Sequence, residues 1–149
     1  LGGFPSPVLF NEDLFFAAQC ILADYGVAYA SDARVIHSHN YTLGQQFRRY
    51  FDNGVSMRGN DRVYAYSGVG RSGSSMVMAV ARELIRRRKA QYIPRLLAEA
   101  AVKLIGYQLG KRHRLLPAAL CRRFSMHRGI WERYYTAYQA SPGGETLRG

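Results

Sequence analysis

Two adjacent carboxylates, Glu12 and Asp13, follow Asn11 at the point where a loop rich in glycine and proline gives way to a helical pattern. A carboxylate at the mouth of a cleft can act as a general base and remove the proton from an incoming hydroxyl group. Acidic residues in the first turn of a helix also serve as plain caps, because they interact favourably with the positive end of the helix dipole. The spacing alone leaves both interpretations open.

Two histidines, His37 and His39, stand two positions apart at the end of a run that favours a β-strand. Side chains at i and i+2 point to the same face of a strand, so both imidazoles could reach one ion. Neutral imidazole is a ligand for ions such as Mn²⁺ and Zn²⁺. The alternative is that the two histidines simply end the strand.

The segment 45–50, QQFRRY, combines amides, guanidinium groups and aromatic rings in a short helical pattern that Gly54 is expected to close. An arginine guanidinium suits bidentate contact with phosphate oxygens, and a tyrosine ring can stack on a sugar or a base. The candidate binding residues are Gln46, Arg49 and Tyr50. Without other evidence, the segment is an ordinary amphipathic helix.

The elements that must position these residues follow an α/β pattern. Residues 12–25 are predicted as a helix that Asn11 caps and Gly26 ends. Residues 27–30 and 33–37 are rich in β-branched and aromatic side chains, and they are predicted as two strands joined by a tight turn. A helix followed directly by strands is typical of an α/β sheet domain.

A run rich in glycine and serine at residues 67–75 predicts a flexible linker, and therefore a domain boundary after residues 1–66. Residues 76–131 are predicted as a basic helical region, and residues 132–149 as a tail.

Three helices are expected in the basic region. The first has apolar residues at the spacing of one helical face, namely Val77, Val80, Ala81, Leu84 and Ile85. The second begins at Pro94 and stops at Gly106 or Gly110, and the third runs from Pro117 toward Met126.

Charge is distributed unevenly along the 149 residues. The net charge is +11, and it divides into −1 for residues 1–70 and +12 for residues 71–149. Cys20 and Cys121 lie far apart in the sequence and are typical of ordinary thiols in a reducing compartment. No uncharged stretch approaches the ~20 apolar residues of a membrane-spanning helix, so neither such a helix nor a signal peptide is expected.

Taken in order, these segments resemble the C-terminal half of an inverting glycosyltransferase of family 2, the GT-A type. Phe10-Asn11-Glu12-Asp13 looks like the ED motif of that family, which implies that Asp13 is the catalytic base and that Glu12 orients the acceptor or caps the helix. His37 stands where a histidine completes the family's metal site, which implies a divalent cation, Mg²⁺ or Mn²⁺. The segment from Gln46 to Tyr50 resembles the QxxRW box, with Tyr in place of Trp, which implies acceptor or phosphate binding.

The resemblance implies an α/β fold, the C-terminal part of a GT-A nucleotide-diphospho-sugar transferase fold followed by an α-helical C-terminal extension. It also implies that Asp13 and His37 approach a common cleft. The family's metal-binding DxD sequence occurs nowhere in the 149 residues, and the chain starts at Leu1 in a loop-like run. We therefore expect a fragment of a longer enzyme, inactive by itself.

A narrower likeness, to bacterial rhamnosyltransferases of surface-polysaccharide synthesis, spans roughly residues 1–131. It rests on the order of five segments, 37–43, 49–55, 104–110, 116–117 and 125–128. This likeness implies a nucleotide-sugar donor, dTDP-rhamnose, and a glycan or lipid-linked acceptor.

The basic helices have three interpretations: a solvated face, a nucleic-acid site, or an electrostatic anchor to anionic lipid. Each Lys or Arg near an anionic leaflet is worth ~1 kcal/mol, which favours the membrane surface. The patterns of RNA-recognition modules are missing, so nucleic acid is not the expected partner. The candidate membrane-surface residues are Arg82, Arg86, Arg87, Lys89, Lys111 and Arg112.

The expected location is therefore cytoplasmic, peripheral at the inner face of the bacterial cell membrane. The alternative to an enzyme is a non-enzymatic basic module that binds anionic membrane or nucleic acid.

Overall fold

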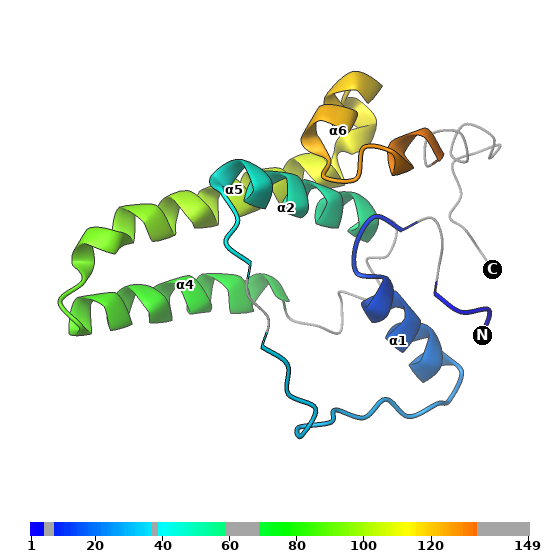
Figure 1. The fold of residues 1–149 in the computed structure, drawn as a ribbon, viewed down its shortest axis with the longest axis horizontal. Helices are drawn as coiled ribbons and strands as arrows, with labels where there is room; N and C mark the ends of the chain where they lie inside the picture. The colour runs from blue at the N-terminus through cyan, green and yellow to red at the C-terminus, as the bar shows by residue number, and fades with distance from the viewer. Residues whose placement is uncertain (5–7, 37–38, 59–68, 134–149) are drawn as a thin grey trace.

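The computed structural model describes residues 1–4, 8–36, 39–58 and 69–133, and within these ranges it contains helices and no β-strand. The elements are α1 (Glu12–Leu22), α2 (Leu43–Met57), α4 (Val69–Arg86), η1 (Ala90–Tyr92), α5 (Ile93–Lys111), η2 (His113–Leu115) and α6 (Ala118–Phe124), of which η1 and η2 are short 3-10 helices. Figure 1 shows α4 and α5 as a long hairpin that projects to one side, with α1 and α6 toward the opposite end. None of the helices in the described part of the chain is long and apolar enough to cross a membrane.

The prediction of an α/β fold of the GT-A type is wrong for the residues that the structure describes. Within the segments predicted as strands, the described residues 27–30 and 33–36 form an exposed loop, with a turn at residues 31–32 as expected. Tyr29, Val35 and Ile36 are the bulky residues that suggested strands, yet they are almost fully exposed. A strand needs a neighbouring strand to pair with its backbone and a layer to cover its side chains, and the described residues provide neither.

Helix α1 begins at Glu12 as predicted but ends at Leu22, before Gly26. Asp24 takes the left-handed conformation, with φ of 61°. The N–H of Tyr25 donates to the carbonyl of Cys20 at 2.9 Å, which closes a Schellman-type cap. An aspartate therefore ends the helix where a glycine was expected.

Helices α2 and α5 form the main contact of the fold, and three glycines let their backbones touch. A Cβ atom added at Gly106 would lie 2.6 Å from the carbonyl oxygen of Phe47. One added at Gly54 would collide with the carbonyl of Tyr107, and one at Gly110 would collide with the carbonyl of Phe51. Interaxial distance depends on the side chains at the crossing, so the absence of Cβ atoms allows the closest approach.

Three glycines that were predicted to end helices lie inside them instead. Gly54 does not close α2, which continues to Met57. Neither Gly106 nor Gly110 stops α5, which continues to Lys111 after starting with Pro94 in its first turn. In all three cases the glycine lies inside a helix because the neighbouring helix occupies the space of a side chain.

The predictions for the flanking helices are closer to the structure. Helix α6 follows Pro117 as predicted. Helix α4 is confirmed but begins at Val69, so residues 69–75 of the predicted linker are helical. The division of the chain into domains stays a prediction.

A small core forms where α2 meets α6. The buried apolar residues are Leu9, Phe51, Val55, Cys121 and Trp131. The ring of Phe51 lies 5.7 Å from that of Phe124 and 6.1 Å from that of Trp131. Leu9 comes from the loop before α1, so its burial fixes residues 10–13 beside α2.

Two titratable side chains are buried next to this core. Asp52 accepts a hydrogen bond from the backbone N–H of Met126 at 2.8 Å, which ties the segment after α6 to α2. Burial raises the pKa of Asp52, and hydrogen bonds from Ser125 and Met126 partly offset that effect. His113 lies edge-on to Trp131 with its Nδ1 2.9 Å from the carbonyl oxygen of Gly110, and burial lowers its pKa to about 4.

We predict that Gly54→Ala lowers the free energy of unfolding by about 2 kcal/mol, because overpacking against a backbone outweighs the helix propensity gained. The matched control is Gly44→Ala, also in α2, where an added Cβ meets nothing within 4 Å. That control should raise the stability by about 0.5 kcal/mol. Urea unfolding followed by circular dichroism measures both, and equal effects of the two variants would contradict the close contact.

We also predict that His113 makes the free energy of unfolding fall as the pH drops from about 6.5 toward about 4, whereas Asp52, whose pKa is raised by burial, acts in the opposite direction. The unfolded chain binds a proton at His113 in this range while the folded chain does not, so acid favours unfolding, by on the order of 2 kcal/mol. His113→Phe should flatten this dependence relative to the unchanged chain, whereas replacing the exposed His39 by Gln should leave it intact. Urea midpoints measured across the range test this, and an unchanged slope in His113→Phe would refute it.

Candidate active site

Asn11 holds the start of α1 against α2. Its backbone is left-handed, with φ of 65° and ψ of 33°. Contrary to the prediction, its side chain makes no capping hydrogen bond to the helix. Instead its Nδ2 donates a hydrogen bond to Oδ1 of Asn53 at 2.9 Å and contacts the sulfur of Met57 at 3.6 Å. Asparagine tolerates left-handed backbone better than most residues do. The side chain of Asn11 makes no cap and instead bridges α1 and α2.

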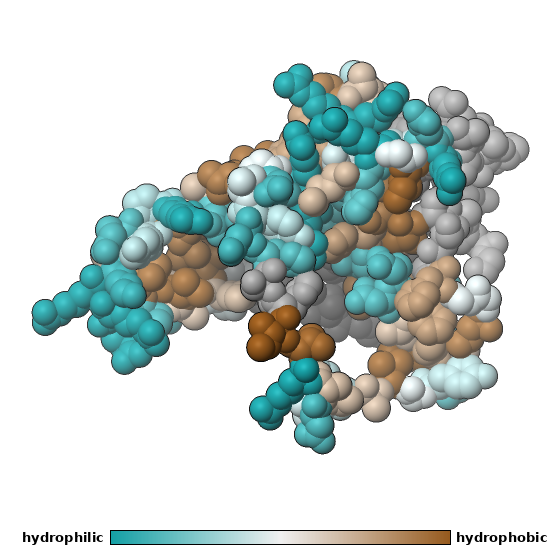
Figure 2. All heavy atoms as spheres, in the orientation of Figure 1, coloured by the Kyte–Doolittle hydropathy of each residue, from teal (hydrophilic) through white to brown (hydrophobic). Residues whose placement is uncertain are grey.

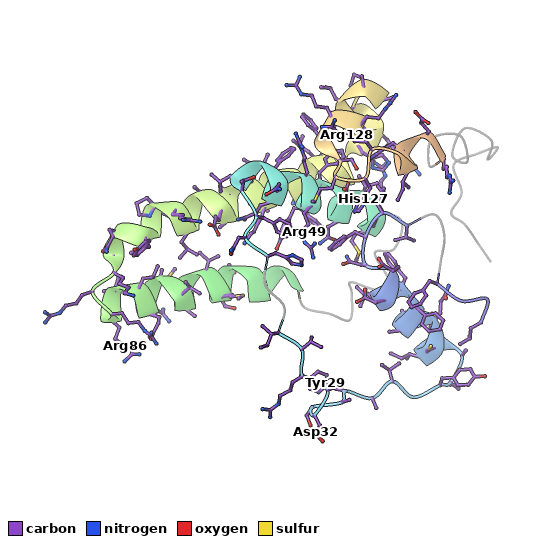
Figure 3. The ribbon with its side chains drawn as sticks, viewed as in Figure 1. Tyr29, Asp32, Arg49, Arg86, His127 and Arg128 are labelled. Atoms are coloured by element: carbon purple, nitrogen blue, oxygen red, sulfur yellow. The ribbon has the colours of Figure 1, made fainter. Side chains whose placement is uncertain are left out.

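Arg49 of α2 contacts the loops that precede both α1 and α2. Its guanidinium lies 4.3 Å from the ring centre of Phe10 and 5.5 Å from that of Tyr41. Its Nη1 also donates to the hydroxyl of Tyr41 at 3.3 Å. Figure 3 shows Arg49 on the side of α2 that faces these loops. A cation over an aromatic ring contributes ~0.5–2 kcal/mol, so Arg49 helps to fix both loops.

Glu12 and Asp13 are exposed in the first turn of α1. One oxygen of Asp13 accepts a hydrogen bond from the backbone N–H of Leu14 at 2.8 Å. No ion pair engages either carboxylate among the described residues. The Asp13 carboxylate is therefore open to solvent and to an approaching hydroxyl group.

Gln46 shares Tyr41 with Arg49 as a contact, whereas Tyr50 does not. Gln46 is buried, and its Nε2 donates to the backbone oxygen of Tyr41 at 3.4 Å. Its Oε1 is buried and finds no hydrogen-bond partner within the described ranges. Tyr50 turns toward α5, where the ammonium of Lys103 lies 5.9 Å from its ring. The structure thus brings Arg49, but not Tyr50, to the motif at residues 10–13.

The predicted metal ligand, His37, lies outside the described residues, so its relation to Asp13 stays a prediction. His39 is described, and its ring stacks on that of Tyr41 at 4.7 Å. Among the described residues no group of three or more His, Cys, Asp or Glu side chains could hold a metal ion. The described part of the chain does not assemble a metal site by itself.

Sequence reasoning missed two residues that shape this region. Thr42 caps α2 through a reciprocal capping box with Gln45, and the Thr-x-x-Gln spacing was the available signal. Asn53 receives the side chain of Asn11 across 42 positions, and no local pattern could have indicated that contact.

The basic residues predicted as a membrane surface fall into two groups. Arg82, Arg86, Arg87 and Lys89 lie at the outer end of the α4–α5 hairpin, and Lys111 and Arg112 lie at the other end of α5. At a rise of 1.5 Å per residue, α5 separates the two groups by roughly 27 Å. They therefore cannot act as one compact patch.

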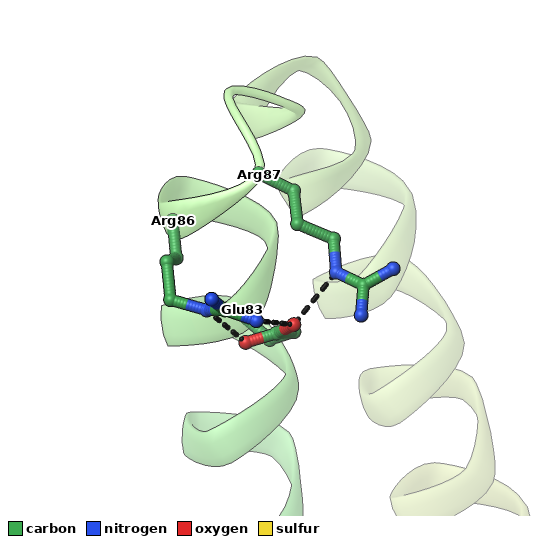
Figure 4. A network of polar contacts seen from close by, with 3 residues as sticks. All are labelled: Glu83, Arg86 and Arg87. Atoms are coloured by element: carbon green, nitrogen blue, oxygen red, sulfur yellow. Dashed lines mark hydrogen bonds and ion pairs between the residues drawn. The ribbon is translucent and has the colours of Figure 1, made fainter.

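Glu83 pairs with two arginines of the outer group, as Figure 4 shows. Its carboxylate lies 2.6 Å from nitrogen atoms of both Arg86 and Arg87. Hydrogen bonds from these two arginines lower the pKa of Glu83 to about 2. The trio keeps one net positive charge at neutral pH.

Comparison with known proteins shows that the chain has relatives. It is 42% identical over 132 residues to the O-antigen chain rhamnosyltransferase WbaN of Salmonella anatum. It is 40% identical over 132 residues to the O-antigen chain rhamnosyltransferase RfbN of Salmonella typhimurium. The chain is thus similar to proteins named as rhamnosyltransferases.

These matches cover most of this chain but less than half of each relative. Each covers 88% of this chain but 42% of the relative, so the chain spans less than half the length of these curated relatives. No family model matches the chain. No solved structure matches it either.

The bond between Asn11 and Asn53 predicts a measurable coupling. In a double-mutant cycle of Asn11→Gly and Asn53→Ala, the two changes should interact by about 1 kcal/mol in the free energy of unfolding. Glycine keeps the left-handed backbone at position 11, so the cycle reports the side-chain bond rather than backbone strain. A coupling energy near zero in urea unfolding would show that the two side chains do not bond.

Proposed function

We propose that this chain is part of a rhamnosyltransferase of glycosyltransferase family 2. The enzyme would move rhamnose from a nucleoside-diphosphate donor, dTDP-rhamnose, to a surface-polysaccharide or lipid-linked acceptor. The observation that carries the proposal is the 40–42% identity, over 88% of the chain, to two proteins named as O-antigen chain rhamnosyltransferases. The aligned part includes most of the chain, so it supports a common function better than a match to one short motif would.

Asp13 is the proposed general base. In an inverting transfer the acceptor oxygen attacks the anomeric carbon of the donor, the bond from that carbon to the nucleoside diphosphate breaks, and Asp13 takes the proton of the acceptor hydroxyl. Its exposure and its lack of an ion pair among the described residues support this role. Glu12, one position earlier, would orient the acceptor.

Arg49 is the proposed contact for acceptor or phosphate groups on the same side. The rings of Phe10 and Tyr41 hold its guanidinium, which limits the entropy lost when it binds a ligand. Gln46 would act indirectly, because it is buried and supports the Tyr41 backbone. Tyr50 would contribute only if a ligand reaches the α5 side of α2.

The divalent cation, Mg²⁺ or Mn²⁺, remains a further proposal with His37 as its one named ligand. The described residues do not assemble a metal site, and the roles proposed for Asp13 and Arg49 need no metal. Loss of activity on chelation, with recovery on adding back either ion, would support it.

The proposed function is tested in the protein that contains this chain, with radiolabelled dTDP-rhamnose and a purified lipid-linked glycan acceptor. Asp13→Asn should lower the rate of transfer by ~10²–10⁴-fold, because general-base assistance is worth that much. Asp32→Asn, the matched control on an exposed carboxylate of the loop after α1, should retain full activity.

A protein that binds acceptor or vesicles but transfers no sugar would favour the alternative of a non-enzymatic basic module. An Asp13→Asn variant as active as the unchanged enzyme would remove Asp13 from the reaction while leaving the transferase proposal standing.

A further inference from the structure

The outer end of the α4–α5 hairpin carries a dense group of exposed basic side chains. They are Arg82, Arg86, Arg87, Arg88, Lys89 and Arg95. Against them stand only Glu83 and Glu99, so residues 82–99 have six basic and two acidic side chains and a net charge of +4. Figure 3 places Arg86 at this end, and Figure 2 shows hydrophilic side chains gathered there. We refer to residues 82–99 as the hairpin tip.

Ion pairing divides these charges into two sets. Glu83 engages Arg86 and Arg87, and Glu99 lies 3.1 Å from Arg95. Within the described part of the chain, no ion pair engages the other three basic residues of the tip, Arg82, Arg88 and Lys89. These three side chains are the ones available to an external anion.

Arg88 occupies a position that usually belongs to glycine. Its φ is 56°, and the N–H of Lys89 donates to the carbonyl of Leu84 at 2.8 Å, which is the Schellman-type end of α4. Left-handed backbone is unfavourable for a side chain with a Cβ, so folding alone would favour glycine here. An arginine at this position exposes a charge at the turn instead.

Apolar side chains accompany the charges at the tip. Ile85, Tyr92 and Leu97 are each at least half exposed. Figure 2 shows hydrophobic side chains directly beside the hydrophilic ones on the hairpin. Basic residues next to exposed aliphatic and tyrosine side chains suit the boundary between lipid headgroups and acyl chains. A single-stranded nucleic acid would instead need several aromatic rings for stacking, and the tip has one.

We propose that the hairpin tip is a docking surface for anionic phospholipid. Arg82, Arg88 and Lys89 would contact the headgroups, and Ile85 and Tyr92 would enter the interfacial layer. Glu83 would limit the attraction by holding Arg86 and Arg87. The proposal is independent of sugar transfer, because binding to lipid needs neither donor nor acceptor.

The structure separates the tip from the basic residues at the far end of α5. The backbone oxygen of Lys111 accepts a hydrogen bond from Arg58 at 3.0 Å, and Arg112 donates to Gln108 at 3.3 Å. Both residues lie where α5 meets the rest of the fold. They therefore provide a control of two basic residues that should not take part in docking.

The test is flotation of the 149-residue chain with vesicles of phosphatidylglycerol and phosphatidylcholine, because flotation separates bound protein from aggregates. Binding should be strong at low salt and lost near 1 M NaCl, where the Debye length falls to about 3 Å. Arg88→Gly should weaken binding about fivefold with no loss of thermal stability, and joint replacement of Arg82, Arg88 and Lys89 should weaken it about a hundredfold.

Two further variants distinguish binding by the hairpin tip from attraction due to the net charge of the whole chain. Glu83→Gln should bind about fivefold more tightly, because it removes a negative charge and releases two arginines. Joint replacement of Lys111 and Arg112 by Gln should leave binding unchanged. The proposal is overturned if the chain binds pure phosphatidylcholine equally well, or if its binding does not depend on salt. It is also overturned if the Lys111 and Arg112 variant loses more binding than the tip variants, or if the chain binds RNA more tightly than anionic vesicles.

Discussion

The direct contact between the backbones of α2 and α5 is the constraint on which the rest of the structure depends. Three glycines, Gly54, Gly106 and Gly110, leave no Cβ between the two helices. This contact fixes α2, which carries Phe51 into the core. Helix α2 also places Arg49 against Phe10 and Asn53 against Asn11, at the start of α1. Without that fixed helix, the loop that brings Asp13 into place would have nothing to bind.

Charge is used in two different ways at the two ends of α5. Near the inner end, Asp52 of α2 and His113 are buried, Oδ2 of Asp52 accepts from the N–H of Met126, and Nδ1 of His113 lies beside the carbonyl of Gly110, whereas Oδ1 of Asp52 finds no hydrogen-bond partner among the described residues. Burying these groups costs desolvation energy that the hydrogen bonds only partly offset. At the outer end, the arginines are exposed, and only part of their charge is balanced by Glu83. The long hairpin keeps these two regions apart, which allows a candidate catalytic region and a candidate lipid-binding region to coexist in a short chain.

Local patterns predicted the helices well because apolar spacing and capping act over a few residues, as in α4, α5 and α6. They failed for the strands near Tyr29 and Val35, since strand formation depends on a partner that no local pattern reveals. Glycine was also an ambiguous signal for the end of a helix, because it can either end a helix or let a neighbouring backbone approach closely. In the candidate site, the motif residues were visible in sequence, whereas the long-range bond from Asn11 to Asn53 followed only from the fold.

The close approach of α2 and α5 can be measured directly by nuclear Overhauser effects between the α-protons of Gly54 and Gly110. The Cβ position of Gly110 lies 3.0 Å from the Cα of Gly54, so the α-proton of Gly110 on that side lies close to Gly54. A strong cross-peak between these assigned protons is the predicted result. Its absence, in a chain whose α2 and α5 are shown to be helical by their chemical shifts, would contradict the arrangement on which the candidate site depends.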